Sequence, residues 1–339
     1  FRVFTKILKI SSVGGQLCRR LTHLNSIFED IKKNSFVSLK CRNLISAIIV
    51  DVLLGILVTI LIQKYIELNE LLEAVLIHTN YVVNELQKLL YWLMGVPAGL
   101  KLNKPLNNAL GHFFLYHIYL WKTYMAIIKP VFIFIMESFT LIGMLGVTFL
   151  LTLFNDLISL ATIHIYCFYG YAARLFGLQA LGMSALWRLF WGKKWNPLRQ
   201  RVDSYTYDVH QLFLGTLMFT ILLFLLPTVM LYYVVFTVLR LLVLMIQGII
   251  GRTVNLLNTL PAFVILLRLM GSSRMKGDVQ FTVTTSPENG PTILYMKVIH
   301  IPYMSVVQMT LPSDETEEQK LSWKFLLSSL IWGRIIYPL

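Results

Sequence analysis

The sequence predicts a mainly α-helical, polytopic membrane protein with about four spans, amphipathic helices at the membrane interface and a small C-terminal α+β tail. Composition is the first reason, because 56% of the 339 residues are hydrophobic and only 14% are charged. Soluble domains are about 45–50% apolar and about 25% charged. The second reason is a set of apolar tracts near the ~20 residues that cross hydrocarbon as a helix. The third is an alternating apolar and polar segment near the C-terminus, which is typical of a β-hairpin.

The N-terminal segment, residues 1–42, is basic and only weakly amphipathic. The first predicted span follows at residues 43–63 and lies between Arg42 and Lys64. We expect the first segment to lie in the cytosol and residues 43–270 to form the membrane domain.

Residues 64–130 predict amphipathic helices that lie in the interface or pack on neighbouring spans, because acidic residues recur too often for hydrocarbon. The second predicted span is 131–155, with Glu137 near one end and Asp156 just beyond the other. Residues 157–173 follow without a turn signal, so they form either a third short span or a continuation of the same helix.

The longest apolar tract runs from Leu212 to Gly251 and contains one charged residue, Arg240. Roughly forty helical residues would reach about twice the hydrocarbon thickness. Pro227 is the natural break, so we predict spans at 211–230 and 231–250. A single kinked helix with a long interfacial tail is the alternative.

The last segment, residues 271–339, predicts a small tail outside the membrane. The run GDVQFTVTTSPENGPTILYMKVIHIP alternates on either side of a Pro-Glu-Asn-Gly-Pro turn and predicts a β-hairpin. MSVVQMTLP is a candidate further strand, and residues 315–332 predict a helix.

The N-terminal segment and the 174–201 loop are both rich in Lys and Arg, which places both in the cytosol. Four spans satisfy this rule and place both termini there.

A stretch of tryptophans and cations, LWRLFWGKKWNPLRQRVD at 186–203, is the main candidate binding surface. Gly192 is expected to end one helix, and Asn196-Pro197 to begin another over 198–207. Tryptophan favours the headgroup layer and cations favour anionic lipid. A generic juxtamembrane anchor and a docking site for partners or lipid headgroups remain equal alternatives. The candidate residues are Trp187, Arg188, Trp191, Lys193, Lys194, Trp195, Arg199, Arg201, Asp203 and Asp208.

Three polar residues stand out within or beside the predicted spans: Asp51, Asp156 and Arg240. A carboxylate in mid-bilayer costs several kcal/mol unless it is paired or faces water. Asp51 therefore marks either a lipid, ion or proton site or a polar clasp to another helix or a partner subunit. We favour the clasp, because no second acid or base lies at the middle of another predicted span.

The sequence predicts no catalytic residue, no metal site and no cofactor. It contains no HExxH, DxD, G-x-S-x-G or GxxxxGK[ST] pattern. The net charge of +13 favours contact with anionic lipid, and we expect no nucleic acid partner.

GKKWNPLRQRVDSYTYDVHQLFLGTLMFTILLFLLPT, residues 192–228, resembles the hallmark segment of the subunit Q (PIG-Q) family of glycosylphosphatidylinositol-N-acetylglucosaminyltransferase. The resemblance extends to 106–121, 164–178, 184–195 and 232–243, so it covers the chain from about 100 to 270. The segments IHIPYMSVVQMTLP and IIYPL near the C-terminus are similar to the family more loosely.

The resemblance implies a function that composition cannot supply. The complex of that family lies in the endoplasmic reticulum membrane and transfers N-acetylglucosamine from UDP-GlcNAc to phosphatidylinositol on the cytosolic face, the first step of GPI-anchor synthesis. Catalysis belongs to another subunit, so the resemblance implies a non-catalytic assembly and stabilising subunit. The implied partners are the other subunits, including the catalytic glycosyltransferase, and membrane lipid, with phosphatidylinositol as the candidate.

Two other functions remain open from the residues alone. In the first alternative, the chain is itself a membrane-embedded, lipid-linked glycosyltransferase. Its candidate acidic residues are then Glu67, Glu70 and Glu73. In the other it is a lipid or ion transporter that uses Asp51, with Arg240 as a second charged group.

Overall fold

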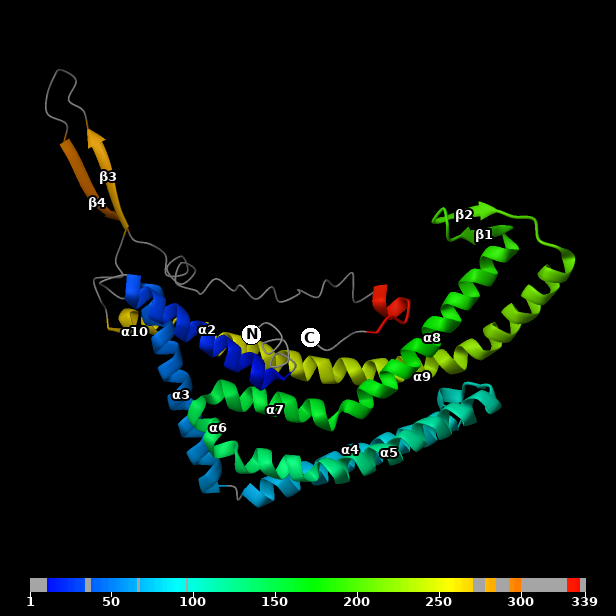
Figure 1. Ribbon diagram of the computed structural model, residues 1–339, viewed down its shortest axis with the longest axis horizontal. Coiled ribbons are helices and arrows are strands. Elements are labelled where there is room, and N and C mark those ends of the chain that lie inside the picture. Colours follow the sequence, from blue (N-terminus) through cyan, green and yellow to red (C-terminus); the bar gives the residue numbers. More distant parts are fainter. Residues whose placement is uncertain are drawn as a thin grey trace. The chain divides into compact units, whose positions relative to one another are not determined.

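The computed structural model describes residues 11–33, 38–65, 68–95, 97–270, 278–284, 293–299 and 328–335, and these are mostly helical (Figure 1). The chain divides into two compact units, and α7 and α9 contribute residues to both. Unit 1 comprises Phe1–Glu67, Glu137–Asp156 and Ile249–Glu317. Unit 2 comprises Leu68–Met136, Leu157–Gly248 and Glu318–Leu339.

Unit 1 is built around α3, which packs against α2, α6 and α10. A Cβ atom on Gly55 of α3 would lie 2.7 Å from the Cα atom of Gly146, so only glycine allows this approach to the segment between α6 and α7. The helices of this unit are α2 (Ser12–Lys33), α3 (Leu39–Tyr65), α6 (Phe139–Leu145), the first part of α7 (Val147–Ala161), the end of α9 (Val209–Asn258) and α10 (Ala262–Leu269).

The turn between α2 and α3 is held by polar and apolar contacts. The carboxylate of Asp30 accepts hydrogen bonds from the backbone N–H (3.1 Å) and the hydroxyl (2.8 Å) of Ser38. Ile27 of α2 packs with Cys41 and Leu44 of α3 in a small buried cluster. Residues 12–33 are therefore joined to the first membrane helix through packed side chains.

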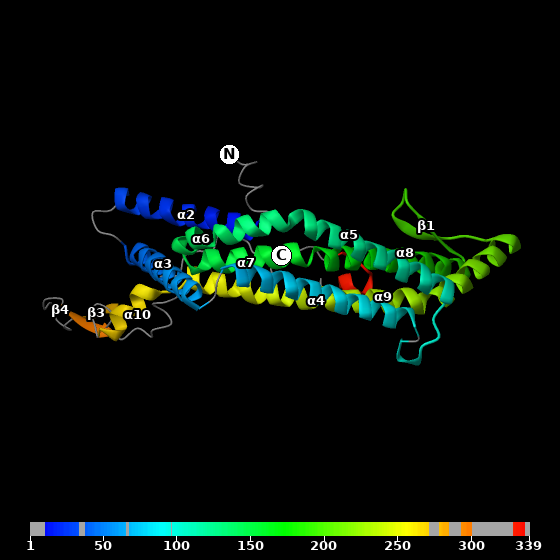
Figure 2. The ribbon, with the colours of Figure 1, turned by 90° about the horizontal axis from the view of Figure 1, so that it is seen from below.

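Unit 2 has an aromatic core between four helices that run side by side (Figure 2). The rings of Phe114, Phe168 and Phe236 are at most 2% exposed, and the Phe114 and Phe236 centroids are 4.6 Å apart. Asn107 donates to Leu93 O (3.1 Å) and accepts from the Tyr232 hydroxyl (2.7 Å). The elements are α4 (Leu68–Met94), η1 (Pro97–Gly99), α5 (Lys104–Glu137), α8 (Ile163–Phe190), β1 (Lys193–Asn196), β2 (Arg201–Ser204) and most of α9.

Three of the described helices are long and apolar enough to cross a membrane: Leu39–Tyr65, Lys104–Ile135 and Val209–Asn258. A fourth crossing is added if α7 and α8, which meet at a 54° bend, form one broken span. The prediction of a helical membrane protein is confirmed, and the first predicted span corresponds to α3.

The predicted single span at 131–155 is wrong. The chain leaves the α-helix at Ser138 and again at Gly146, so α5, α6 and α7 divide this tract. Gly146 has φ 137° and ψ 160°, a backbone conformation that is essentially restricted to glycine and ends α6. The candidate span lies earlier, from Lys104 to Ile135, where only amphipathic helices were expected. Uniform apolar composition hid the break, because hydropathy does not report backbone conformation.

Residues 157–173 are neither a separate span nor a straight continuation. α7 ends at Ala161, and α8 begins at Ile163 after the bend.

The helix break predicted at Pro227 is also wrong, because α9 is continuous for 50 residues. The single-helix alternative describes it better. Proline removes one backbone hydrogen bond and crowds the carbonyl four residues earlier. For Pro227 that carbonyl is Leu223 O, and the neighbouring Leu222 O accepts a hydrogen bond from Gln179 Nε2 of α8 (2.8 Å). In helices of membrane proteins, neighbouring helices, polar side chains and small backbone adjustments allow proline within the helix.

The predicted C-terminal β-hairpin is confirmed. β3 (Asp278–Thr284) pairs antiparallel with β4 (Ile293–Ile299), and Phe281 lies opposite Met296. The Pro-Glu-Asn-Gly-Pro turn, the candidate strand at 304–312 and residues 315–327 of the predicted helix lie outside the described residues. Residues 328–331 are helical.

We predict that Gly146→Ala lowers the free energy of unfolding by about 1–3 kcal/mol, because alanine is strained at this backbone conformation. Its Cβ atom would also collide with the Asp51 carboxylate. The measurement is thermal unfolding of the purified protein in mild detergent. Gly170→Ala is the control, because it lies within α8 and its added Cβ atom meets nothing within 4 Å. Equal melting temperatures for the two variants would contradict the prediction.

Candidate functional site

Helix α2 turns two polar residues, Gln16 and Arg20, toward other helices and exposes a row of large apolar residues. Gln16 is buried at 3% exposure, and the Arg20 side chain is 11% exposed. The spacing of three and four residues places a second set about a quarter turn round the helix from Gln16 and Arg20. These large apolar residues are exposed: Leu17, Leu21, Leu24, Phe28 and Ile31. The inward polar face of α2 therefore brings hydrogen-bonding groups to α3, α7 and α9.

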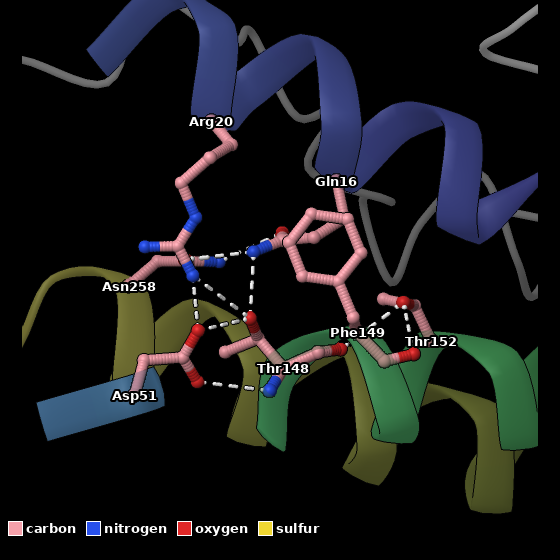
Figure 3. A network of polar contacts seen from close by, with 7 residues as sticks. All are labelled: Gln16, Arg20, Asp51, Thr148, Phe149, Thr152 and Asn258. Atoms are coloured by element: carbon pink, nitrogen blue, oxygen red, sulfur yellow. Dashed lines mark hydrogen bonds and ion pairs between the residues drawn. The ribbon is translucent and has the colours of Figure 1, made fainter. Parts of the chain in front are cut away.

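Asp51, at the middle of α3, is the acceptor for this face (Figure 3). Its side chain is 3% exposed and forms an ion pair with Arg20. One carboxylate oxygen accepts from the Thr148 backbone N–H (2.9 Å) and the other from the Thr148 hydroxyl (2.8 Å). Thr148 is the second residue of α7, whose first backbone N–H groups have no partner within the helix. Asp51 therefore caps the N-terminus of α7 from another helix, where a negative charge is stabilised by the helix dipole.

The contacts continue from Thr148 to α9. Gln16 Nε2 donates to Thr148 Oγ1 and to Asn258 Oδ1, both at 2.9 Å. Asn258 Nδ2 donates back to Gln16 Oε1 at 2.9 Å. We call Gln16, Arg20, Asp51, Thr148 and Asn258 the Asp51 cluster. It joins four helices through charged and amide groups, which is the arrangement expected of a polar clasp within one chain.

Asp156 of α7 has the same role at the start of α2. Its carboxylate accepts from the backbone N–H groups of Ser12 (2.8 Å) and Val13 (3.1 Å) and from the Ser11 hydroxyl. α2 begins at Ser12, so Asp156 caps its first turn. Asp51 and Asp156 thus each cap a helix that belongs to another segment.

Sequence reasoning missed the partner of Asp51, because Arg20 lies in the segment that was expected to be a separate cytosolic region. The available signal was a regular row of apolar residues at spacings of three and four, which leaves Gln16 and Arg20 on a neighbouring face of the same helix. Such a face predicts that a helix docks through its polar side when a buried acid lies nearby in the sequence.

Arg240, the third polar residue, lies in unit 2. It is 5% exposed, and its guanidinium carbon lies 4.8 Å from the centroid of the Tyr166 ring. Within the described ranges it has no carboxylate partner, and its Nε atom has no hydrogen bond. The cation–π contact is therefore the interaction that the structure assigns to it.

The candidate binding surface at 186–203 is a helix end followed by a β-hairpin. α8 ends at Phe190, and Gly192 follows with φ 59°, so the predicted helix end is confirmed. The helix predicted over 198–207 is wrong, because β1 and β2 form an antiparallel hairpin. Asn196 Oδ1 accepts from the backbone N–H groups of Leu198 (3.1 Å) and Arg199 (3.3 Å), and Gln200 has φ 49°. A positive φ is incompatible with a right-handed helix, so this turn reverses the chain. We call residues 193–204 the basic hairpin.

The three tryptophans of this region do not form one stripe. Trp187 lies on α8 against Phe219, Trp191 lies at the end of α8, and Trp195 lies on β1. All three are between 45% and 66% exposed. The predicted row therefore becomes three separate exposed rings near one end of α8.

The charged residues of the region divide into paired and unpaired groups. Asp203 accepts from Asn196 Nδ2 (2.9 Å) and Arg201 Nε (2.7 Å), so both carboxylate oxygens are engaged. Asp208 accepts from the backbone N–H of Val209 at the start of α9, and Arg188 is half-buried on α8. Lys193 and Lys194 lie over the Trp191 and Tyr205 rings, at 5.9 and 4.9 Å to the centroids.

An open groove of about 540 Å³ lies in unit 2 between α4, α8 and α9. Its lining is mainly aliphatic and aromatic, with an ion pair between Glu85 and Lys88 (2.7 Å) on α4. The hydrogen bond from Lys88 to Glu85 raises the pKa of Lys88.

In the described part of the chain, no group of three or more His, Cys, Asp or Glu side chains could hold a metal ion.

Comparison with known proteins places this architecture in a family. A family model described as Gpi1, N-acetylglucosaminyl transferase component, matches residues 15–277, from α2 to the segment before β3. The chain belongs to the Gpi1 family. The matched range contains the Asp51 cluster, Asp156, Arg240 and the basic hairpin.

Individual relatives agree with the family model. The chain is 45% identical over 324 residues to the mouse protein named phosphatidylinositol N-acetylglucosaminyltransferase subunit Q. This alignment covers 95% of this chain and 56% of the mouse protein. It is 45% identical over 308 residues to the human protein of the same name, and this alignment covers 89% of this chain and 39% of that protein. A fission yeast (Schizosaccharomyces pombe) protein, named N-acetylglucosaminyl-phosphatidylinositol biosynthetic protein gpi1, is 33% identical over 206 residues, covering 61% of this chain and 32% of that protein.

The chain thus spans about half or less of the length of these curated relatives. No solved structure matches it.

We predict that Asp51→Ala lowers the free energy of unfolding by about 3–5 kcal/mol, because it leaves the Arg20 guanidinium buried without its counter-charge. The measurement is unfolding of the purified chain in mild detergent. Asp203→Ala is the control, because it removes the aspartate of a largely exposed pair and should cost less than about 1 kcal/mol. Similar losses in the two variants would show that the Asp51 cluster is not specially stabilising.

We predict that Asp156→Ala frays the start of α2, because the backbone N–H groups of Ser12 and Val13 lose their acceptor. Loss of such a cap costs about 1 kcal/mol. Amide hydrogen exchange of the first turns of α2 should accelerate severalfold, and Asp156→Asn, which keeps one acceptor oxygen, should show a smaller effect. Unchanged exchange in the alanine variant would rule out the capping role.

Proposed function

We propose that this chain is a non-catalytic assembly and stabilising subunit of the membrane complex that transfers N-acetylglucosamine from UDP-GlcNAc to phosphatidylinositol, the first step of GPI-anchor synthesis. The observation that carries the proposal is the 45% identity over 324 residues to the mouse protein named subunit Q. The proposed partners are the other subunits, including the catalytic glycosyltransferase, and membrane lipid, with phosphatidylinositol as the candidate.

The geometry of the acidic residues supports a structural role for this chain. A catalytic carboxylate needs an oxygen that can reach a substrate or a reacting proton. Both oxygens of Asp51 accept hydrogen bonds from Thr148 and one also pairs with Arg20, while both oxygens of Asp156 cap α2. Carboxylates engaged in this way hold helices together, which favours the scaffold over a transporter that uses Asp51.

The exposed helix surfaces support association with lipid and other subunits. Large apolar side chains on α3, α5 and α9 are exposed, among them Leu53, Ile127, Phe213 and Phe224 at 61–75%. Surfaces of this kind are covered by lipid or by helices of partner proteins. We propose the endoplasmic reticulum membrane as their location. By the positive-inside rule, we propose the cytosolic side for the basic hairpin. Because α9 is one continuous helix, a single crossing by it would place the C-terminal tail on the opposite side from the hairpin, so the expected arrangement with the hairpin and both termini in the cytosol is not compatible with this helix.

The test is a mild-detergent purification of the tagged chain from cells, followed by mass spectrometry and an assay of UDP-GlcNAc-to-phosphatidylinositol transfer on the eluate. We predict that transfer activity is recovered only together with a separate glycosyltransferase subunit. We also predict that Asp51→Ala reduces the recovered activity and subunit in proportion, because a destabilised scaffold assembles less complex.

Gly170→Ala is the matched control. This variant should recover the same transfer activity and the same amount of glycosyltransferase subunit as the unaltered chain. Activity from the purified chain alone would refute the non-catalytic role. A stable chain recovered without any glycosyltransferase would refute the subunit role.

A further inference from the structure

The connection of the basic hairpin places it near a membrane face. It joins the end of α8 to the start of α9 (Figure 1). α9 is long and apolar enough to cross a membrane, and α8 belongs to the bent pair that passes the same test. The hairpin lies across the end of α8 and does not continue the helix axis (Figure 1). The apolar tract of α9 begins at Leu212, eight residues after the end of β2 at Ser204, so the ribbon lies close in sequence to the point where α9 would enter hydrocarbon.

The two faces of the hairpin differ in chemistry. Trp195 lies directly opposite Val202, and their side chains share one face because residues paired across an antiparallel ladder point the same way. Both are more than 40% exposed. The opposite face carries the pairs Lys194↔Asp203 and Asn196↔Arg201. The pair Lys193↔Ser204 lies on the same face as Trp195 and Val202, because alternate residues of a strand share a face. One face of the ribbon therefore combines exposed aromatic, aliphatic and cationic side chains, and the other face is polar.

The turn places a further apolar group at the tip. Leu198 is 94% exposed, although it is a large aliphatic side chain. The turn is well defined, because Asn196 Oδ1 accepts from Leu198 N–H and Gln200 Nε2 donates to Pro197 O (2.8 Å). Leu198 is thus held outward by a hydrogen-bonded turn, next to Arg199.

The charges of the hairpin leave three cations available. Asp203, the acidic residue of the ribbon, is already engaged by Arg201 and Asn196. Lys193, Lys194 and Arg199 are exposed and have no carboxylate partner in the described ranges. Two of them lie over the aromatic rings of Trp191 and Tyr205. Arg201 is therefore a positioning residue for the ribbon, and the other three cations are free to meet anions.

We propose that the basic hairpin docks onto the anionic phospholipid headgroups of its own membrane face. Leu198 and Trp195 enter the interface, while Lys193, Lys194 and Arg199 contact lipid phosphates. The proposal deepens the proposed function, on which it rests for the membrane in which the chain works, and it names the lipid contact and its residues.

Lipid fits this surface better than a protein partner does. Lysine is depleted in protein interfaces, whereas tryptophan and lysine together are typical of the headgroup layer. The apolar elements are a single tip residue and one cross-strand pair, which suit shallow insertion between headgroups. The recognition is of negative charge, so phosphatidylserine should replace phosphatidylinositol.

The experiment places a reporter at the tip of the full chain. Leu198→Cys, in a background with Cys18, Cys41 and Cys167 replaced by alanine, is labelled with an environment-sensitive fluorophore and reconstituted in nanodiscs. The discs contain phosphatidylcholine alone, or phosphatidylcholine with phosphatidylinositol or phosphatidylserine, and a lipid-borne quencher. We expect a blue shift and quenching in both anionic discs, with the effect reduced by added salt.

A charge variant makes the result specific. Each cation near an anionic surface contributes about fivefold to binding, so Lys193→Gln, Lys194→Gln and Arg199→Gln together should lower the docking equilibrium on the order of a hundredfold. Lys101→Gln, Lys104→Gln and Lys122→Gln remove the same charge from exposed positions elsewhere in unit 2 and should leave it unchanged. Equal loss in both triple variants would overturn the proposal.

Two further outcomes would also overturn it. A label at residue 198 that remains in water in every disc excludes docking. A label that is shielded only when a glycosyltransferase subunit is present, whatever the lipid, shows that the hairpin binds protein. Co-purification of the charge variant with that subunit is measured in parallel, so that failure of the hairpin proposal is distinguished from failure of the subunit proposal.

Discussion

A carboxylate in the middle of an apolar helix constrains unit 1. Asp51 lies within a helix that can cross a membrane, and an unpaired charge there would cost several kcal/mol. Two partners must therefore come to it: the guanidinium of Arg20 and the first backbone N–H groups of α7. The start of α7 and the docking of α2 both follow from this requirement. The same requirement explains the glycine at position 146, because the Asp51 carboxylate occupies the space that a Cβ atom would need there.

The second carboxylate, that of Asp156, also caps a helix that belongs to another segment. Asp51 of α3 caps α7, and Asp156 of α7 caps α2, whose Arg20 returns to Asp51. Each helix end thus supplies positive partial charge to an acid on the next helix, and the polar groups of one helix satisfy those of another. This closed cycle explains why Gln16 and Arg20 of α2 face inward, on the same side as the buried Ile27. In a membrane protein, lipid or another apolar surface can cover the exposed apolar row of this helix.

Local signals in the sequence predicted those features that depend on a few neighbouring residues. The length of α3, the end of α8 at Gly192 and the hairpin around Pro-Glu-Asn-Gly-Pro are of this kind. Features that depend on distant partners were missed. Gly146 breaks a uniformly apolar tract because Asp51, 95 residues earlier, lies against it. Pro227 stays within a helix, with Gln179 bonded to a carbonyl group before it. The hairpin at 193–204 was readable in principle, since Asn-Pro favours a turn as well as a helix start.

The distribution of charge connects the fold with the proposed role. The acids at the centre of unit 1 are bound to cations and helix ends, and Asp203 is bound by Arg201 and Asn196. Lysines and arginines outnumber the acidic residues, 30 to 17. Among the described residues, Lys193, Lys194 and Arg199 are exposed and have no carboxylate partner. Internal carboxylates therefore determine how helices meet, while external cations are available to the surroundings. A chain with this division of charge fits the proposed scaffold, in which internal carboxylates hold the helices of unit 1 together and external cations meet an anionic lipid surface.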